Sequence, residues 1–335
     1  MAPPTNGRPA RAHPSVTSTS TTSPGPVRIA LDLLGGDDAP AVVVDGAVRA
    51  CAADPDLRLL LVGSVGLLDE AVRAFPASAH GRLTLRPARG AVGMADAPSR
   101  GSRADTSVRG AVNAVVEGVA DAVVSAGASG ASVTAAALGL GRLPGVRRPA
   151  LAATLPAAAG SLVLLDVGGS LDHSPATLLR HAQLGAAYAA AVRPDVPPRV
   201  GLLSIGVEPG KGDRSRRLAA VALAKAPLPA GAGYVGLVEG HEVGLGSRAN
   251  VVVTDGFTGN ILLKGVEGAY AMAGAPHPAP AAAPLLGVNG VVVVCHGAAD
   301  GADIASGIAL AAALARDGVV ARLTSLLPEP VEATG

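Results

Sequence analysis

The sequence contains very few aromatic residues. Phenylalanine and tyrosine together make up 1% of its 335 residues and tryptophan is absent, whereas 49% of the residues are hydrophobic. The core must therefore consist of alanine, valine and leucine side chains that pack between closely spaced elements. The formal net charge is +1, with no long basic run, and there are few aromatic rings on which bases could stack. Both observations argue against a nucleic-acid-binding surface.

Cysteine is also scarce. Cys51 and Cys295 are the two cysteines, and they lie too far apart to form a metal-ligand pattern. Their number and spacing argue against a disulfide framework or a structural zinc site, and predict a reducing, cytoplasmic compartment. His173, His181 and His241 have no histidine four residues away and stand outside any H-E-x-x-H frame. We therefore predict no metal site.

No segment has the composition of a secretory signal or a membrane span. Residues 1–26 are rich in Pro, Ser and Thr, carry no acidic residue and lack an apolar core. We expect a disordered tail there, with an organellar transit peptide as the alternative. The longest apolar stretch, residues 149–165, is interrupted by Pro156, Gly160 and Ser161. We predict a single α/β/α domain over residues 27–328 and a flexible C-terminus over residues 329–335.

Short β-branched runs alternate with longer alanine-rich segments from residue 27 onward. Several runs are apolar throughout, which is typical of parallel strands covered on both faces. The expected strands are residues 27–33, 57–62, 82–87, 122–125, 162–167, 200–205, 234–238, 251–254 and 288–295. Helices are expected between them, for example at residues 106–119, 175–192, 214–226 and 302–316. This order predicts a three-layer α/β/α fold with a mostly parallel sheet.

Lysine is rare among the 27 basic residues, yet two of the three lysines accompany glycine turns. Lys211 lies within residues 205–213, and Lys264 shortly follows residues 255–260. Lysine binds phosphate as a point charge on a flexible stem, which the planar fork of arginine does not reproduce. These positions favour a site for phosphate or a phosphorylated group. The alternative is that three lysines in an arginine-rich chain fall there by chance.

Glycine turns follow six of the expected strands and precede helices. We expect these turns to lie together at the edge formed by the carboxyl ends of the strands, which is the edge that binds ligands in an open α/β sheet. The six turns could then build one anion pocket lined by backbone amides and helix N-termini. Because the chain has 44 glycines, ordinary tight turns are the alternative, and Asp32, Asp166 and Asp255 could simply cap the helices that follow. The six turns are residues 35–36, 125–130, 166–169, 206–213, 255–260 and 296–297.

Three short patterns lack the context that their motifs need. Residues 231–236 read G-x-G-x-x-G but lead into a strand, whereas the dinucleotide fingerprint opens a helix. Gly210 and Lys211 lack the earlier glycine and the following Ser or Thr of a P-loop. Cys295 and His296 are strand neighbours and point to opposite faces, so they form no nucleophilic dyad. We expect Cys295 in the core, and His296 either at the ligand edge or in a structural hydrogen bond.

Residues 27–335 resemble the bacterial PlsX-type phosphate acyltransferases. The similar segments occur in the same order along the chain, which chance alanine-glycine similarity would not reproduce. The segments are residues 29–37, 120–127, 143–150, 164–168, 199–206, 210–212, 236–240, 252–260 and 284–290, followed by His296 and Gly297.

The resemblance implies transfer of a fatty acyl group from acyl carrier protein to inorganic phosphate, giving acyl phosphate for phospholipid synthesis. It also implies a homodimer without a cofactor, in a fold related to isocitrate dehydrogenase and phosphotransacetylase. Lys211, Asp255, Asn260 and Lys264 are the expected catalytic residues. The expected substrate-binding residues are Asp32, Gly35, Gly36, Gly127, Ser129, Gly130, Asp166, Gly168, Gly210, Gly212, Gly256, Gly259 and His296.

The chain departs from the family pattern at several polar positions. The pattern has amide, carboxylate or hydroxyl side chains where this chain has Ala128, Ser129, Ser170, Ser204, Val207, Ala298 and Ala299. Residues 269–283 are also shorter than the helices the family places there, so we do not expect membrane docking by that route. The alternative function is a catalytically degenerate paralogue that binds phosphate or a carrier protein without turnover. An acyltransferase using coenzyme A thioesters and an oxidoreductase of the related fold are more remote alternatives.

Overall fold

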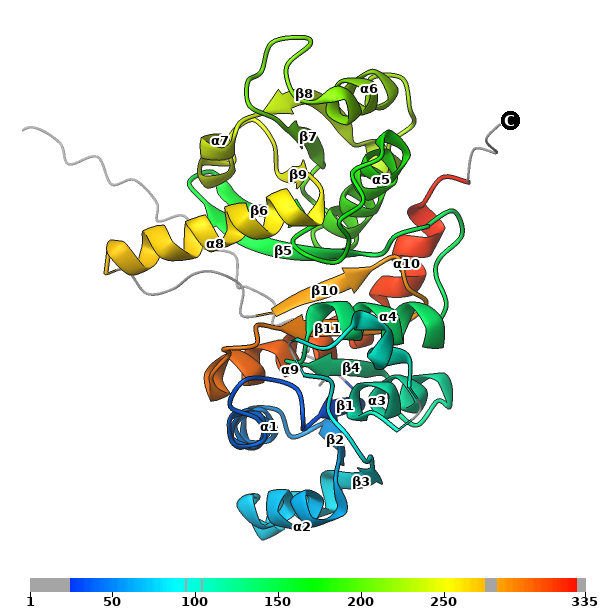
Figure 1. Ribbon diagram of the computed structural model, residues 1–335, viewed down its shortest axis with the longest axis vertical. Helices are drawn as coiled ribbons and strands as arrows, with labels where there is room; N and C mark the ends of the chain where they lie inside the picture. The colour runs from blue at the N-terminus through cyan, green and yellow to red at the C-terminus, as the bar shows by residue number, and fades with distance from the viewer. Residues whose placement is uncertain (1–24, 94, 104, 275–281, 330–335) are drawn as a thin grey trace, which may run out of the picture.

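The computed structural model describes residues 25–93, 95–103, 105–274 and 282–329, and it contains one eleven-stranded sheet (Figure 1). The strands are arranged in the order β3-β2-β1-β4-β11-β10-β5-β6-β9-β7-β8. Their bounds are β1 Val27–Asp32, β2 Leu57–Gly63, β3 Leu83–Pro87, β4 Ala122–Ser125, β5 Ala150–Ala157, β6 Gly160–Leu165, β7 Arg199–Leu203, β8 Gly233–Val238, β9 Val251–Val253, β10 Ala282–Leu286 and β11 Val291–Cys295.

Helices cover both faces of this sheet, which confirms the predicted three-layer fold. Alternate residues of β1 enter two different cores: Ile29 and Leu31 pack with α1 and α9, and Ala30 packs with α3. The helices are α1 Ala41–Ala53, α2 Val65–Ala74, α3 Ser107–Val116, α4 Ser129–Gly139, α5 Pro175–Val192, α6 Arg214–Leu223, α7 Gly240–Leu245, α8 Gly256–Met272, α9 Gly301–Arg316 and α10 Val319–Leu326.

The sheet consists of two parallel halves that run in opposite directions. Strands β1 to β4 and β11 are parallel to one another, and so are β6 to β9. Between them, the pairs β11 with β10, β10 with β5, and β5 with β6 are antiparallel. Figure 1 shows β10 and β5 crossing the middle of the molecule. The expectation of a single carboxyl edge is therefore wrong, because each half has its own.

Small residues bring the layers close together, as the lack of aromatic side chains requires. A Cβ added to Gly46 of α1 would lie 2.5 Å from the Cβ of Ile304 on α9. A Cβ on Gly185 of α5 would lie 2.6 Å from a methyl carbon of Leu165 in β6. Contacts this short leave no room for larger residues at the two glycines.

The strands and helices expected from the sequence are present, with ends that differ by a few residues. The sequence did not predict β5 and β10, which join the two halves. The apolar stretch of residues 149–165 is a hairpin of β5 and β6, and its turn contains Gly160 with a φ of +126°. Among the described helices, none alone is long and apolar enough to cross a membrane; α9 and α10 reach the required length only as a pair bent by 59°.

Candidate anion site where the two halves meet

The glycine turns of the first half contact one another through their backbones. A Cβ added to Gly35, after β1, would lie 2.6 Å from the backbone nitrogen of Gly127, after β4. Gly36 adopts a φ of +122°, which favours glycine, and lies beside the carbonyl of Gly297. The backbone N–H of Asp37 donates to that carbonyl oxygen at 2.8 Å. The turns after β1, β4 and β11 therefore form one cluster.

The turn after β6 packs in the same way against the start of α8. The backbone N–H of Gly256 donates to the carbonyl oxygen of Ser170 at 2.9 Å. A Cβ on Gly259 would lie 1.9 Å from the carbonyl oxygen of Asp166, so only glycine fits there. The side-chain amide of Asn260 donates to the carbonyl oxygen of Val167 at 3.2 Å. This second cluster surrounds the N-terminus of α8, where the helix dipole favours an anion.

The two clusters meet through side chains on α8. The ammonium of Lys264 contacts Nε2 of His296, which follows β11 in the other half. The other ring nitrogen of His296 accepts a hydrogen bond from the backbone N–H of Ala298 at 3.1 Å, and Glu267 pairs with Lys264 at 2.7 Å. His296 thus lies at the ligand edge, exposed, while the adjacent Cys295 is buried. Burial raises the pKa of Cys295 to about 12, so its thiol is inert.

The sixth turn carries Lys211 and lies at the edge of this arrangement. Gly210 and Gly212 have φ values of +91° and +88°, a conformation that requires glycine. The aliphatic stem of Lys211 lies beside Gly206, and the residue is exposed. Across residues 25–329, within the described ranges, its ammonium forms no hydrogen bond or ion pair. Among the described residues, Lys211 is therefore not hydrogen-bonded or ion-paired to residues 255–260.

Two of the expected site carboxylates, those of Asp32 and Asp166, are buried and accept hydrogen bonds from their own chain. Asp166 accepts hydrogen bonds from the backbone N–H groups of Leu151, Gly168, Gly169 and Ser170, at 2.6 to 3.0 Å. Burial raises the pKa of the Asp166 carboxyl, and these donors and His181 oppose that change. Asp32 accepts from Ser125 and Leu34, and burial raises its pKa too. Both carboxylates fix the shape of their turns.

The third carboxylate, Asp255, caps α8. It accepts from the backbone N–H and the hydroxyl of Thr258, at 3.0 and 2.8 Å, and from Arg216 at 2.6 Å. Burial acts to raise the pKa of Asp255, but the hydrogen bonds from Thr258 and the Arg216 guanidinium outweigh it and lower the pKa. Asp255 is therefore an ionised helix cap at neutral pH.

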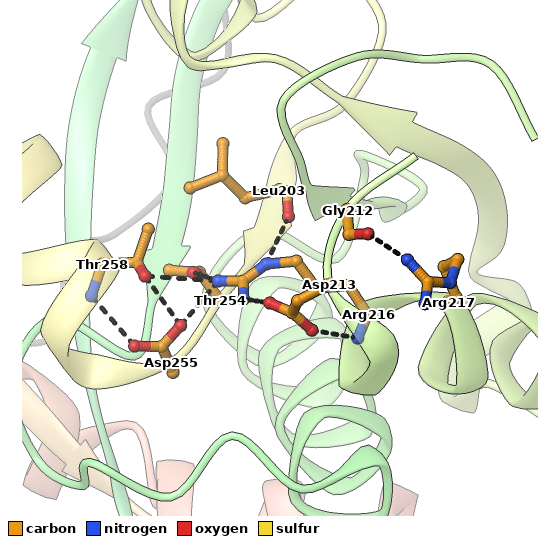
Figure 2. Close-up of polar contacts among 8 residues, drawn as sticks. All are labelled: Leu203, Gly212, Asp213, Arg216, Arg217, Thr254, Asp255 and Thr258. Atoms are coloured by element: carbon orange, nitrogen blue, oxygen red, sulfur yellow. Dashed lines mark hydrogen bonds and ion pairs between the residues drawn. The ribbon is translucent and has the colours of Figure 1, made fainter. Parts of the chain in front are cut away.

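The sequence did not single out Arg216. Residues 214–217 read Arg-Ser-Arg-Arg, which is typical of a solvated helix face, yet the Arg216 side chain is only 11% exposed. Figure 2 shows its guanidinium between the start of α6 and the start of α8. The signal that could have found it is Asp213, a helix cap with an arginine three residues later.

Two other expected residues open α4. Ser129 and Gly130 are its first residues, and the N-cap residue Ala128 has no side chain that could cap the helix. Across the described ranges, no group of three or more His, Cys, Asp or Glu side chains could hold a metal ion.

Together, the two opposed α/β halves and the glycine turns between them define a protein of the phosphotransacetylase-like fold. The EutD phosphotransacetylase from Staphylococcus aureus aligns with a TM-score of 0.59 and 18% identity, covering 87% of this chain and 94% of that one. A phosphotransacetylase from Streptococcus pyogenes aligns with a TM-score of 0.62, the same identity and the same coverage. At this identity the similarity establishes the fold alone.

The chain belongs to the family described as "Fatty acid synthesis protein", which it matches over residues 27–277. A protein of Heliobacterium modesticaldum named phosphate acyltransferase is 37% identical over 338 residues, covering 91% of this chain and 99% of that protein. A protein of the same name from Thermobifida fusca is 41% identical over 330 residues, covering 89% of both. These similarities confirm the PlsX-type resemblance.

Proposed function

We propose that this chain transfers a fatty acyl group from acyl carrier protein to inorganic phosphate, giving acyl phosphate for phospholipid synthesis. The observation that carries the proposal is the contact between Lys264 on α8 and His296, which links the glycine turns of the first half to the cluster around the N-terminus of α8. The names of the relatives and the family match support the same chemistry. The site offers backbone amides and cationic groups, which suit a small oxyanion.

In this mechanism, phosphate binds beside the N-terminus of α8 with Lys264, His296 and Asn260 around it. A phosphate oxygen attacks the thioester carbonyl carbon, and the carbonyl oxygen becomes an oxyanion that N–H donors stabilise. The tetrahedral intermediate then collapses: the carbon–sulfur bond breaks, the carrier thiolate leaves, and the acyl–oxygen bond to phosphate remains. Phosphate is partly dianionic near neutral pH, so holding the two reactants together supplies much of the acceleration.

The buried carboxylates have a supporting role in this proposal. Both oxygens of Asp32, Asp166 and Asp255 already accept hydrogen bonds from donors of their own chain. We therefore assign them to holding the turns and α8, rather than to general base catalysis. Lys211 is proposed to neutralise charge on phosphate or on the carbonyl oxygen, since its ammonium is uncommitted in the part of the chain the structure describes.

We further propose that the protein is a cytoplasmic homodimer that uses α8 as part of its interface. Phe257, Ile261 and Met272 are 62%, 57% and 92% exposed, and they lie along one side of the helix. Figure 1 shows α8 projecting to the left from the middle of the molecule. Residues 269–272 complete this helix, and residues 275–281 of the shortened segment lie outside the described ranges.

The activity is tested with purified protein, palmitoyl acyl carrier protein and phosphate, by trapping acyl phosphate with hydroxylamine. We expect product formation that depends on phosphate and is slower with palmitoyl coenzyme A. Lys211→Ala should lower kcat/KM by about 10- to 100-fold, the effect of losing a hydrogen bond from a charged group. Lys225→Ala is the matched control, because that lysine is exposed and lies after α6.

Two outcomes would contradict this assignment. If the wild-type protein forms no acyl phosphate at high enzyme concentration while phosphate still raises its melting temperature, the protein is the binding paralogue without turnover. If Lys211→Ala and Lys225→Ala behave like the wild type, Lys211 has no role in the reaction.

A further inference from the structure

One side chain connects four elements around the candidate site. The guanidinium of Arg216, in the first turn of α6, donates to the carbonyl oxygen of Leu203 at the end of β7, at 3.0 Å. It also donates to the carboxylate of Asp213, the cap of α6. Its second terminal nitrogen reaches Thr254 at 3.1 Å, Asp255 at 2.6 Å and Thr258 at 3.2 Å, at the end of β9 and the start of α8 (Figure 2).

The charges around Arg216 show that it does not bind the anion itself. Two carboxylates pair with its guanidinium: Asp213 with one terminal nitrogen and Asp255 with the other. Their two negative charges exceed its single positive charge, and its nitrogens already donate to five groups. An incoming phosphate would have to displace a carboxylate from a largely buried site, which is costly.

Arg216 also contacts the turn that carries Lys211. A Cβ added to Gly212 would lie 3.1 Å from the Cβ of Arg216, so this end of the turn rests on the arginine stem. The adjacent Arg217 donates to the carbonyl oxygen of Gly212, and its side chain is on the exposed side of the helix. The turn is therefore connected to the N-terminus of α8 through Arg216.

We propose that Arg216 is a positioning residue that holds the Lys211 turn against the phosphate-binding end of α8. The proposal rests on the proposed function, because it assumes that phosphate binds at that helix end. The role requires arginine, since a planar guanidinium reaches acceptors in several directions and a lysine ammonium is a single point. Loss of the guanidinium would leave Asp213 and Asp255 as two unpaired negative charges beside the phosphate.

The test is the kinetics of Arg216→Ala in the full-length protein. We expect the KM for phosphate to rise by about 10- to 100-fold, because one charge-assisted network is lost and two carboxylates then repel the anion. The KM for the acyl donor should stay within about twofold of the wild type. Arg216→Lys should give an intermediate KM for phosphate. Added guanidinium ion should lower the KM of Arg216→Ala for phosphate more than added methylammonium does.

The control is Arg316→Ala, which removes a comparable arginine far from the site. Arg316 is 17% exposed and donates to Asp54 at 2.7 Å and to the carbonyl oxygen of Gly25. We expect it to lower the melting temperature but to leave the KM for phosphate unchanged. The proposal is overturned if Arg216→Ala resembles this control, or if its KM for phosphate equals that of the wild type. Where Arg216→Ala does not fold, Arg216→Lys decides by the same criterion.

A phosphate-binding measurement tests the role of Arg216 independently of transferase activity. If the wild-type protein has no transferase activity, the rise in melting temperature with added phosphate is measured for the wild type and for Arg216→Lys. A smaller rise in the variant supports the positioning role although the proposed function has failed. An equal rise in both proteins overturns the role.

Discussion

At the scale of the residue, glycines place main-chain atoms where side chains would otherwise be. Gly256 and Gly259 on α8 allow the helix to contact the turn of residues 166–170 directly, and an added Cβ at either would overlap a carbonyl oxygen at 2.4 or 1.9 Å. Gly265, six residues after Gly259 on the same helix, has open space around it.

 The same substitution therefore has opposite consequences at positions 259 and 265.

Gly259→Ala should destabilise the protein by about 1–3 kcal/mol, because the new methyl group must push α8 away from the turn of residues 166–170. Gly265→Ala should stabilise it by about 0.5–1 kcal/mol, since alanine is the better helix former at an open position. Urea unfolding of both variants measures the difference. Equal free energies of unfolding for the two variants would show that α8 does not pack on that turn.

The residue types of the site were largely readable from the sequence, but their partners were not. Lysine and glycine are informative because few other residues can replace them, so Lys264 and the glycine turns could be singled out. The role of Arg216 depends on Thr254, Asp255 and Thr258, which are about 40 positions away in the sequence. Local pattern does not encode such distant pairings, and this arginine was therefore missed.

At the scale of the element, α8 depends on an ionised cap. Asp255 is the N-cap residue, and its hydrogen bonds to Thr258 and Arg216 lower its pKa below the usual value of 3.8, despite burial. A carboxyl with a lowered pKa in the folded state contributes stability that is fully present above its unfolded pKa. That contribution is lost as the pH falls through the folded pKa.

Asp255→Asn should therefore lower the melting temperature at pH 7, and the difference from the wild type should shrink as the pH falls below about 4. Asparagine still caps a helix, so the loss reflects mainly the charge that pairs with Arg216. Thermal unfolding from pH 7 to pH 3 measures the effect. A difference that is constant over this range would show that the ionised form of Asp255 is not what stabilises α8.

The strands of the parallel halves were predictable because most are short apolar runs and six of them are followed by a glycine turn. β5 and β10 were not, because β5 contains three alanines at its start and a proline near its end, and β10 is alanine-rich and short. Their antiparallel pairing reverses the direction of the sheet, and strand direction follows from contacts between distant segments. The layered fold could thus be predicted, whereas the opposite strand directions of its two halves could not.

At the scale of the whole molecule, the exposed side of α8 determines how two copies could associate. We expect the wild-type protein to be a dimer by light scattering. Met272→Glu should raise the dimer dissociation constant by about tenfold or more, because a carboxylate would be buried at the interface. Val221→Glu is the control, as Val221 is 58% exposed on α6.

A monomeric wild-type protein would remove the dimer from the proposal. A dimer that Met272→Glu leaves intact would place the interface on a different surface. In either case the transferase assay still decides the chemistry, because Lys264 and His296 belong to one chain.

The main-chain lining of the site has a consequence for sequence divergence. Ala128, Val207 and Ala298 have apolar side chains where the resemblance predicted polar ones, but each has its backbone N–H group. Where the glycines fix the path of the chain, substitutions can remove polar side chains one after another. The backbone N–H groups that could bind an anion remain. A sequence can thus diverge far from its relatives at such positions while the backbone that supports the reaction persists.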